Sequence, residues 1–224
     1  MQRRILTSTV YRQDSHGRSD GLRIDPGNRL LWRMTPRRLE GEIIRDAVLA
    51  TAGTLDLKMY GEPVSTDTKP SGEIVPEGDT AGGRRSIYQI VRRSGPQSLL
   101  EVFDTPVMET NCTRRVNSTT ATQALALMNG EFITSQAQHL ADRVLKAAPP
   151  SGGVLQPADH TTASYAFRVA FGRQPETREV GDMLAFLQEQ AGRYQNLDPE
   201  AVERKIYADL CQALFSMNEF VYVD

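Results

Sequence analysis

The chain has 224 residues, of which 39% are apolar and 24% charged, and its formal net charge is −2. A chain of this length can bury a hydrophobic core without metal or disulfide crosslinks. The near-neutral charge excludes a uniformly basic nucleic-acid-binding protein. No apolar run reaches the roughly 18 residues needed to span a bilayer, and the first residues lack the apolar segment of an export signal.

Positive charge is concentrated in the first half of the chain. Residues 1–115 carry 18 basic and 15 acidic residues, whereas residues 116–224 carry 8 and 13. Arginine supplies 22 of the 26 basic residues. Two explanations of the arginine excess stay open. One is a GC-rich coding sequence. The other is structural: the basic first half packs on the acidic second half or on a partner.

The first 34 residues contain few features of regular structure. The apolar residues of 5–12 recur at about helical spacing, but the stretch is too short for a stable isolated helix. The polar residues, glycine and proline of 13–28 predict an extended loop, and 28–34 predicts one short buried turn. We therefore expect an exposed apolar surface near the N-terminus.

A helix is predicted over 36–52. Thr35 is a suitable N-cap, Pro36 suits the first helical position, and Gly53 is a suitable left-handed end. The stretch 61–83 is rich in proline and glycine and predicts a flexible loop. The stretch 84–93 is β-rich with charged ends and predicts a short extended segment.

The second half is predicted to be helical, because apolar residues recur there at helical spacing. A proline- and glycine-rich linker is expected at 149–158. The chain is therefore expected to form a mainly α, irregular helical fold with one or two short extended segments, as one domain over 1–224. The predicted helices of this half span about 119–128, 131–147, 160–171, 176–191 and 198–217.

One stretch, residues 103–120, gathers chemically active side chains just before a predicted helix. Free amides at a helix start can hold an anion, and a nearby arginine strengthens such a site. The alternative is a buried irregular loop tied down by its own hydrogen bonds, with an arginine paired to Asp104 or Glu109. The candidate residues for this anion site or ion-pair cluster are Asp104, Glu109, Arg114, Arg115, Ser118 and Thr119.

Other chemical signatures are missing from the sequence. The three histidines lie far apart and do not form a zinc motif, and the sequence lacks a covalent haem motif and a phosphate-binding loop. No histidine is placed in sequence to activate Cys112 as a nucleophile. Whether Cys112 pairs with Cys211 stays open, because sequence cannot place their Cα atoms.

Several stretches of the chain, in order, form a recognisable series. They are LTSTVYRQ (6–13), DPGNRLLWR (25–33), RRSIY (84–88), VMETNCTRR (107–115), ATQALALMN (121–129), ADLCQAL (208–214) and NEFVYVD (218–224). Together they resemble a planctomycete-specific C-terminal domain of unknown function. The resemblance extends over nearly the whole chain, and the family brings no known catalytic residues.

The resemblance implies a place at the end of large exported proteins, in the cell envelope or periplasm. There the domain usually follows another planctomycete-specific domain, and often a cytochrome c-like domain. It implies that any haem belongs to an upstream domain and that this chain itself holds no cofactor or metal. It further implies that this chain is truncated at its N-terminus.

Two functions are compatible with these observations. The first is a non-catalytic module that docks on its upstream domain or on another envelope protein, without binding nucleic acid or spanning a membrane. The alternative is a hydrolase-like enzyme acting on an anionic or polysaccharide substrate, with Asp104 or Glu109 as general acid or base and Arg114 and Arg115 binding the anion. A pocket joining these side chains would favour the enzyme, and their mutual pairing would favour the module.

Overall fold

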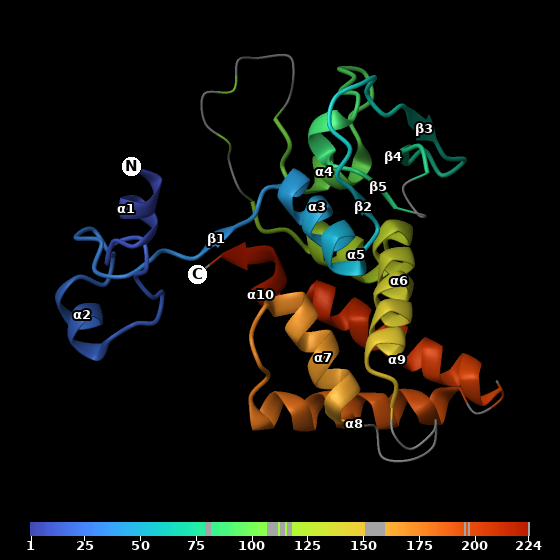
Figure 1. Cartoon of the computed structure of the whole chain (residues 1–224). Coiled ribbons are helices and arrows are strands. Elements are labelled where there is room, and N and C mark those ends of the chain that lie inside the picture. Colours follow the sequence, from blue (N-terminus) through green and yellow to red (C-terminus); the bar gives the residue numbers. More distant parts are fainter. Residues whose placement is uncertain are drawn as a thin grey trace. The chain divides into compact units, whose positions relative to one another are not determined.

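The computed structural model of the chain describes residues 1–78, 82–106, 112, 115, 118–150, 160–194, 196 and 198–223. Within these residues it has ten α-helices and only short strands in two-stranded sheets (Figure 1). The predicted mainly α fold is thus confirmed. The chain divides into two compact units, residues 1–39 with 222–224 and residues 40–221.

The N-terminal unit contains two short helices and one strand pair. Helices α1 (Gln2–Leu6) and α2 (Ser19–Ile24) contain no buried residue. Strand β1 (Arg37–Arg38) pairs antiparallel with β6 (Tyr222–Val223). The prediction of a purely extended loop over 13–28 was wrong, because α2 lies inside it.

The turn at 28–34 is not buried as predicted. Leu30 is 76% and Leu31 is 70% exposed, and the backbone of Leu31 has a φ of +54°. The turn is held by polar contacts instead: Asp25 Oδ2 accepts from the Leu30 amide at 2.7 Å, and Asn28 Nδ2 donates to the Arg33 carbonyl at 2.9 Å. The short apolar run was mistaken for core because sequence pattern does not register such side-chain hydrogen bonds.

Helix α3 (Gly41–Ala52) is shorter than predicted at its start. Its N-cap is Glu40, not Thr35. Pro36 tolerates extended backbone as readily as the first turn of a helix, and the two residues after it form β1. The end of the helix is as predicted, because Gly53 adopts the left-handed conformation with φ +82°.

The middle of the chain is irregular but ordered by short pairings. Within the stretch 61–83, β3 (Thr66–Thr68) and β4 (Ile74–Pro76) form an antiparallel hairpin. Strand β2 (Leu55–Asp56) pairs in parallel with β5 (Gly83–Arg84). The predicted extended segment 84–93 begins in β5 but is interrupted by the 3-10 helix η1 (Ser86–Tyr88), after which Gln89 forms a parallel bridge with Val64. A short helix α4 (Ser98–Val102) follows.

The C-terminal helices match the sequence predictions closely. Residues 151–158 of the predicted linker lie outside the described residues. Among the described residues no helix combines the length and apolar character needed to cross a membrane. The remaining helices are α5 (Ala121–Asn129), α6 (Glu131–Ala147), α7 (His160–Phe171), α8 (Thr177–Arg193), α9 (Pro199–Ser216) and α10 (Asn218–Val221).

Helix α6 is central to the core of the larger unit. It packs against α3, α5, α7 and α9, and α8 packs on α9 (Figure 1). Its Ile133, Leu140 and Val144 are fully buried, and they repeat at the helical spacing that places them on one face. The side chains of Leu210 and Leu214 on α9 are also buried. Burying this shared face stabilises the whole unit by the hydrophobic effect.

We expect Leu140→Ala to lower the free energy of unfolding by about 2–5 kcal/mol, because the truncation removes buried methyl groups and leaves a cavity. Leu125→Ala on α5, where the side chain is 54% exposed, is the matched control and should change it by less than about 0.5 kcal/mol. Urea unfolding followed by circular dichroism measures both. Equal effects of the two substitutions would contradict this assignment of the core.

Candidate functional site

The candidate stretch 103–120 joins α4 to α5 beside α3. Of the six candidate residues, Asp104, Arg115, Ser118 and Thr119 belong to the described part of the chain. Glu109 and Arg114 lie outside the described residues. Arg115 lies in one cluster, and Asp104 and Ser118 lie in a separate one.

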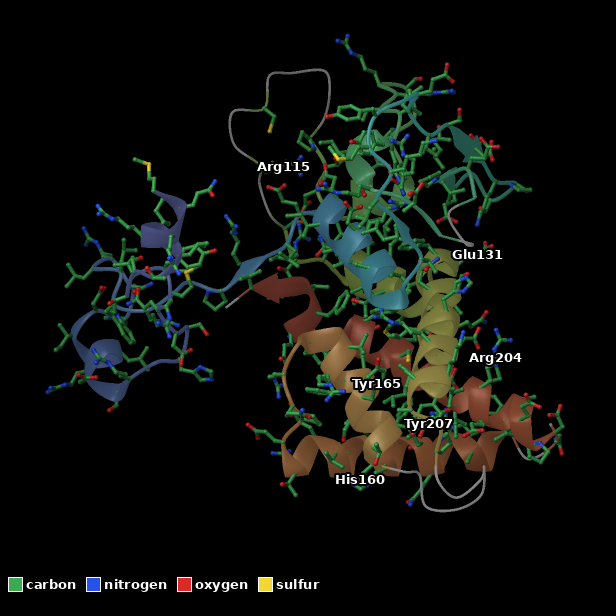
Figure 2. All side chains as sticks on the ribbon, in the orientation of Figure 1. Arg115, Glu131, His160, Tyr165, Arg204 and Tyr207 are labelled. Atoms are coloured by element: carbon green, nitrogen blue, oxygen red, sulfur yellow. The ribbon has the colours of Figure 1, made fainter. Side chains whose placement is uncertain are left out.

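Arg115 is anchored to the start of α3. Its two terminal nitrogens donate to Glu42 at 2.7 and 3.0 Å, and Nη1 also lies 3.2 Å from Glu40 Oε2. Figure 2 labels Arg115 at this end of α3. The predicted internal ion pair therefore exists, but its described partners are Glu42 and Glu40 rather than Asp104. Sequence reasoning missed them because both lie more than 70 residues earlier in the chain.

The ion pair shifts the ionisation of both groups. Partial burial acts to raise the pKa of Glu42, but the hydrogen bonds and positive charge of Arg115 outweigh it and hold this pKa below its ordinary value. The hydrogen bonds from Arg115 to Glu42 likewise raise the pKa of the guanidinium. Both side chains are therefore charged at neutral pH, and Glu42 is poorly suited to act as a general acid there.

Asp104 ties the loop to the start of α5. Its carboxylate accepts from the backbone amide and the hydroxyl of Ser118, both at 2.7 Å. Gln123 Nε2 donates to the carbonyl of Val102 at 3.0 Å and lies 3.3 Å from the Ser118 hydroxyl. Asp104 itself has a left-handed backbone with φ +60°. These bonds hold a sharp turn in place at a half-buried position.

The helix that follows the candidate stretch begins after Thr119. Thr120 is the N-cap of α5, and its amide donates to the Gln123 side chain at 3.4 Å. The amide and the hydroxyl of Ser118 both donate hydrogen bonds to Asp104. Thr119 is exposed.

The two cysteines are both free. Cys112 is exposed and Cys211 is fully buried on α9, where desolvation raises the pKa of its thiol. A buried neutral thiol is a weak nucleophile. Across the described residues no group of three or more histidine, cysteine, aspartate or glutamate side chains is arranged to hold a metal ion.

The sequence prediction missed a buried arginine on α3. Arg45 is 1% exposed, and its Nη1 donates to the Arg84 carbonyl at 3.0 Å and to Ser86 Oγ at 3.3 Å. With the Gln89 amide in the orientation that satisfies both of its ends, the Gln89 oxygen lies 2.9–3.0 Å from three Arg45 nitrogens. Arg45 lies on the same face of α3 as Leu49 and Ala52. A charged residue on an apolar helix face is the sequence feature that could have revealed this buried arginine.

Replacing Arg115 by alanine should lower the free energy of unfolding by about 1–2 kcal/mol, since two charge-assisted hydrogen bonds are lost at a partly exposed site. Arg178→Ala is the control, because its ion pair with Asp182 is almost fully exposed, and it should cost less than about 0.5 kcal/mol. Denaturant unfolding of both variants and of Glu42→Ala measures these changes in the free energy of unfolding. Full additivity in the Arg115, Glu42 double variant would contradict the pairing.

The same pair should make stability depend on pH. Because the pKa of Glu42 is lower in the folded chain, its stabilisation is complete above the pKa of an unfolded glutamate, about 4.3. It is lost as the pH falls through the lower pKa of the folded state. The difference in unfolding free energy between the wild type and Glu42→Gln should therefore be larger at neutral pH than in strong acid. A difference that grows on acidification would be inconsistent with this.

Comparison with known proteins identifies the family of this chain but gives no activity for it. Neither the curated proteins nor the solved structures contain a match to this chain. A family model described as PSD1, a protein of unknown function (DUF1553), matches residues 1–187. The resembling stretches at 208–214 and 218–224 lie beyond that match. Because the match includes most of the chain, the chain belongs to the PSD1 family of proteins of unknown function.

Proposed function

We propose that this chain is a non-catalytic interaction module whose N-terminal unit docks on an acidic surface of a partner protein. The observation that carries the proposal is the nature of the buried residues in 1–39. All of them are polar or charged, namely Ser15, Asp25, Asn28 and Arg38.

A segment of this kind lacks the usual source of stability. About 40 residues without a hydrophobic core generally need a crosslink, a metal or a partner to stay folded. The apolar side chains of the segment face solvent instead, and contiguous exposed apolar surface marks interaction sites. Those that are exposed include Ile5, Leu6, Val10, Tyr11, Leu22, Ile24, Leu30, Leu31 and Met34.

The charge of the segment indicates what kind of partner it suits. Residues 1–39 contain nine arginines and three aspartates, with no lysine or glutamate, so their net charge is +6. Arginine is favoured at interfaces, because its planar group pairs with carboxylates and its stem contributes apolar contact. An acidic protein surface with apolar patches is therefore the complementary partner.

The candidate cluster supports a module rather than a hydrolase. Arg115 is engaged by Glu42, and Asp104 by Ser118. A general acid or an anion-binding arginine needs a side chain that faces substrate, whereas these groups join segments of the loop to α3 and α5. The resemblance to the planctomycete-specific domain indicates which partner to expect. It favours an upstream domain of an exported cell-envelope protein, such as a cytochrome c-like domain.

Site-specific photo-crosslinking in the native cell tests the proposal. A photoreactive amino acid at Ile24, exposed in the N-terminal unit, should give one dominant adduct with an acidic protein or domain. The same amino acid at Leu125, exposed in the larger unit, is the matched control and should not give it. Adduct formation should fall when salt is raised to about 1 M, because screening weakens arginine–carboxylate attraction.

A second variant makes the result specific. Val10→Glu, added to the Ile24 crosslinker, places a negative charge on the apolar surface and should reduce the adduct by about tenfold or more, through repulsion and loss of apolar contact. Identical adducts from Ile24 and Leu125, or an Ile24 adduct unaffected by Val10→Glu, would refute docking through this unit.

A further inference from the structure

A turn of the N-terminal unit holds two adjacent leucines in solvent. We call residues 25–33 the leucine turn. The side chains of Leu30 and Leu31 are 76% and 70% exposed, whereas the neighbouring Trp32 is partly buried and its Nε1 donates to the Asp25 carbonyl at 2.9 Å. The leucine turn therefore exposes two residues of a type that folded proteins mostly bury.

The backbone of the leucine turn is left-handed at two positions. Asn28 has a φ of +51° and Leu31 has a φ of +54°. Asparagine is one of the residues that adopt this conformation readily, whereas leucine does so rarely because its Cβ comes too close to a carbonyl oxygen. Asparagine or glycine at position 31 would hold the same backbone with less strain and without exposed apolar surface. A leucine there is unfavourable for the unit taken alone.

Side-chain hydrogen bonds fix the turn in this strained form. Asp25 Oδ2 accepts from the Leu30 amide at 2.7 Å. Asn28 Oδ1 accepts from the Arg33 amide at 3.3 Å, and its Nδ2 donates to the Arg33 carbonyl at 2.9 Å. Because Asp25 and Asn28 are buried, their polar groups need partners within the turn, and these bonds determine the course of its backbone.

The ring of Trp32 anchors the turn on α2. A Cβ at Gly21 would lie 2.7 Å from this ring, well inside the roughly 3.5–4.0 Å of an ordinary carbon contact. Only glycine lets the indole lie so close to the helix. The leucine turn is therefore preorganised before a partner arrives, which reduces the conformational entropy lost on binding.

The two leucines lie in the chain between two arginines whose charge is not neutralised by the described residues. Arg29 is exposed and forms no ion pair or side-chain hydrogen bond within the described part of the chain. The guanidinium of Arg33 lies 5.4 Å from the centre of the Trp32 ring, and its Nη1 donates to the Ser15 carbonyl at 3.4 Å. An apolar pocket with carboxylates at its rim is the surface complementary to this sequence of groups.

We infer that the leucine turn is the anchor through which the N-terminal unit binds its partner, with Leu30 and Leu31 entering an apolar pocket rimmed by carboxylates. The inference rests on the docking proposed above and names the contact that carries it. Burying the two leucines removes their apolar surface from water. A few fully desolvated side chains at the centre of an interface carry most of its binding free energy. Arg29 and Arg33 then pair with the acidic rim.

Photo-crosslinking from Leu30 in the native cell tests the anchor directly. An aliphatic diazirine amino acid at Leu30 should give the same dominant adduct as one at Ile24. The crosslinked peptide of the partner should contain apolar residues and at least one aspartate or glutamate. An Ile24 adduct without a Leu30 adduct leaves the docking intact and overturns the leucine turn as its anchor. Adducts from neither position overturn both proposals, and a Leu30 adduct to another part of this chain overturns the anchor.

Leu31→Asn separates binding from folding, because asparagine adopts a φ near that of Leu31 more readily than leucine does. In the chain that carries the Ile24 crosslinker it should reduce the adduct by about tenfold or more. The chain has one tryptophan, so an unchanged Trp32 emission spectrum shows that the turn is intact. Tyr60→Asn is the matched control, since Tyr60 of the larger unit is also exposed with a left-handed backbone. It should leave the adduct unchanged.

Leu30→Ser carries the same expectation at a position without a positive φ. It decides the test if Trp32 emission changes in Leu31→Asn. An adduct at the wild-type yield in both leucine variants, or an equal loss in Tyr60→Asn, overturns the inference.

Discussion

The packing of α6 against its neighbours is the interaction on which the rest of the larger unit depends. One helix supplies the apolar face against which α3, α5, α7 and α9 all lie, and α8 is attached through α9. The charged and irregular segments of the middle of the chain gain fixed positions because α3 and α5 are fixed. The Arg115 cluster therefore owes its geometry to a hydrophobic contact that contains none of its residues.

Arginine acts in this protein mainly as a connector between distant segments. Arg115 joins its loop to α3, Arg45 joins α3 to the residues after β5, and Arg84 gathers the carbonyls of residues 58–62. Arg45 and Arg84 bind backbone carbonyls that regular structure leaves unpaired, whereas Arg115 binds two carboxylates, and both uses suit a planar group with five donors. Truncating Arg84 would remove the donors to three carbonyls at once. The abundance of arginine thus has a structural use here.

The two units are stabilised in different ways. The larger unit buries leucine, isoleucine, valine and phenylalanine, whereas the buried residues of 1–39 are polar. In the smaller unit, hydrogen bonds such as that from Trp32 Nε1 to the Asp25 carbonyl, 2.9 Å long, set the local conformation. A hydrogen bond contributes little net free energy when water can replace it. This contrast supports a role for the N-terminal unit in binding rather than in the core of the fold.

The sequence by itself determined the helices of the C-terminal half. Their apolar residues repeat over several turns, and Asp198 before Pro199 marks the start of α9. In the first half, Gly53 likewise marks the end of α3. It also indicated the exposed apolar residues near the N-terminus, since Ile5, Leu6, Val10 and Tyr11 are exposed. These features depend on residues close together in the chain, so periodicity and capping chemistry suffice to predict them.

Only the tertiary structure decided the start of α3, the partners of Arg115 and the partners of Arg45. The start of α3 depends on the pairing of Arg37–Arg38 with Tyr222–Val223, far along the chain. Glu42 is 73 residues from Arg115, and Arg45 contacts Arg84 and Ser86, which are 39 and 41 residues away. Nothing local distinguishes one acidic residue from another as a partner, because ion pairs are selected by distance in space. Distance in space follows from how the helices pack, which a single sequence without a known fold does not provide.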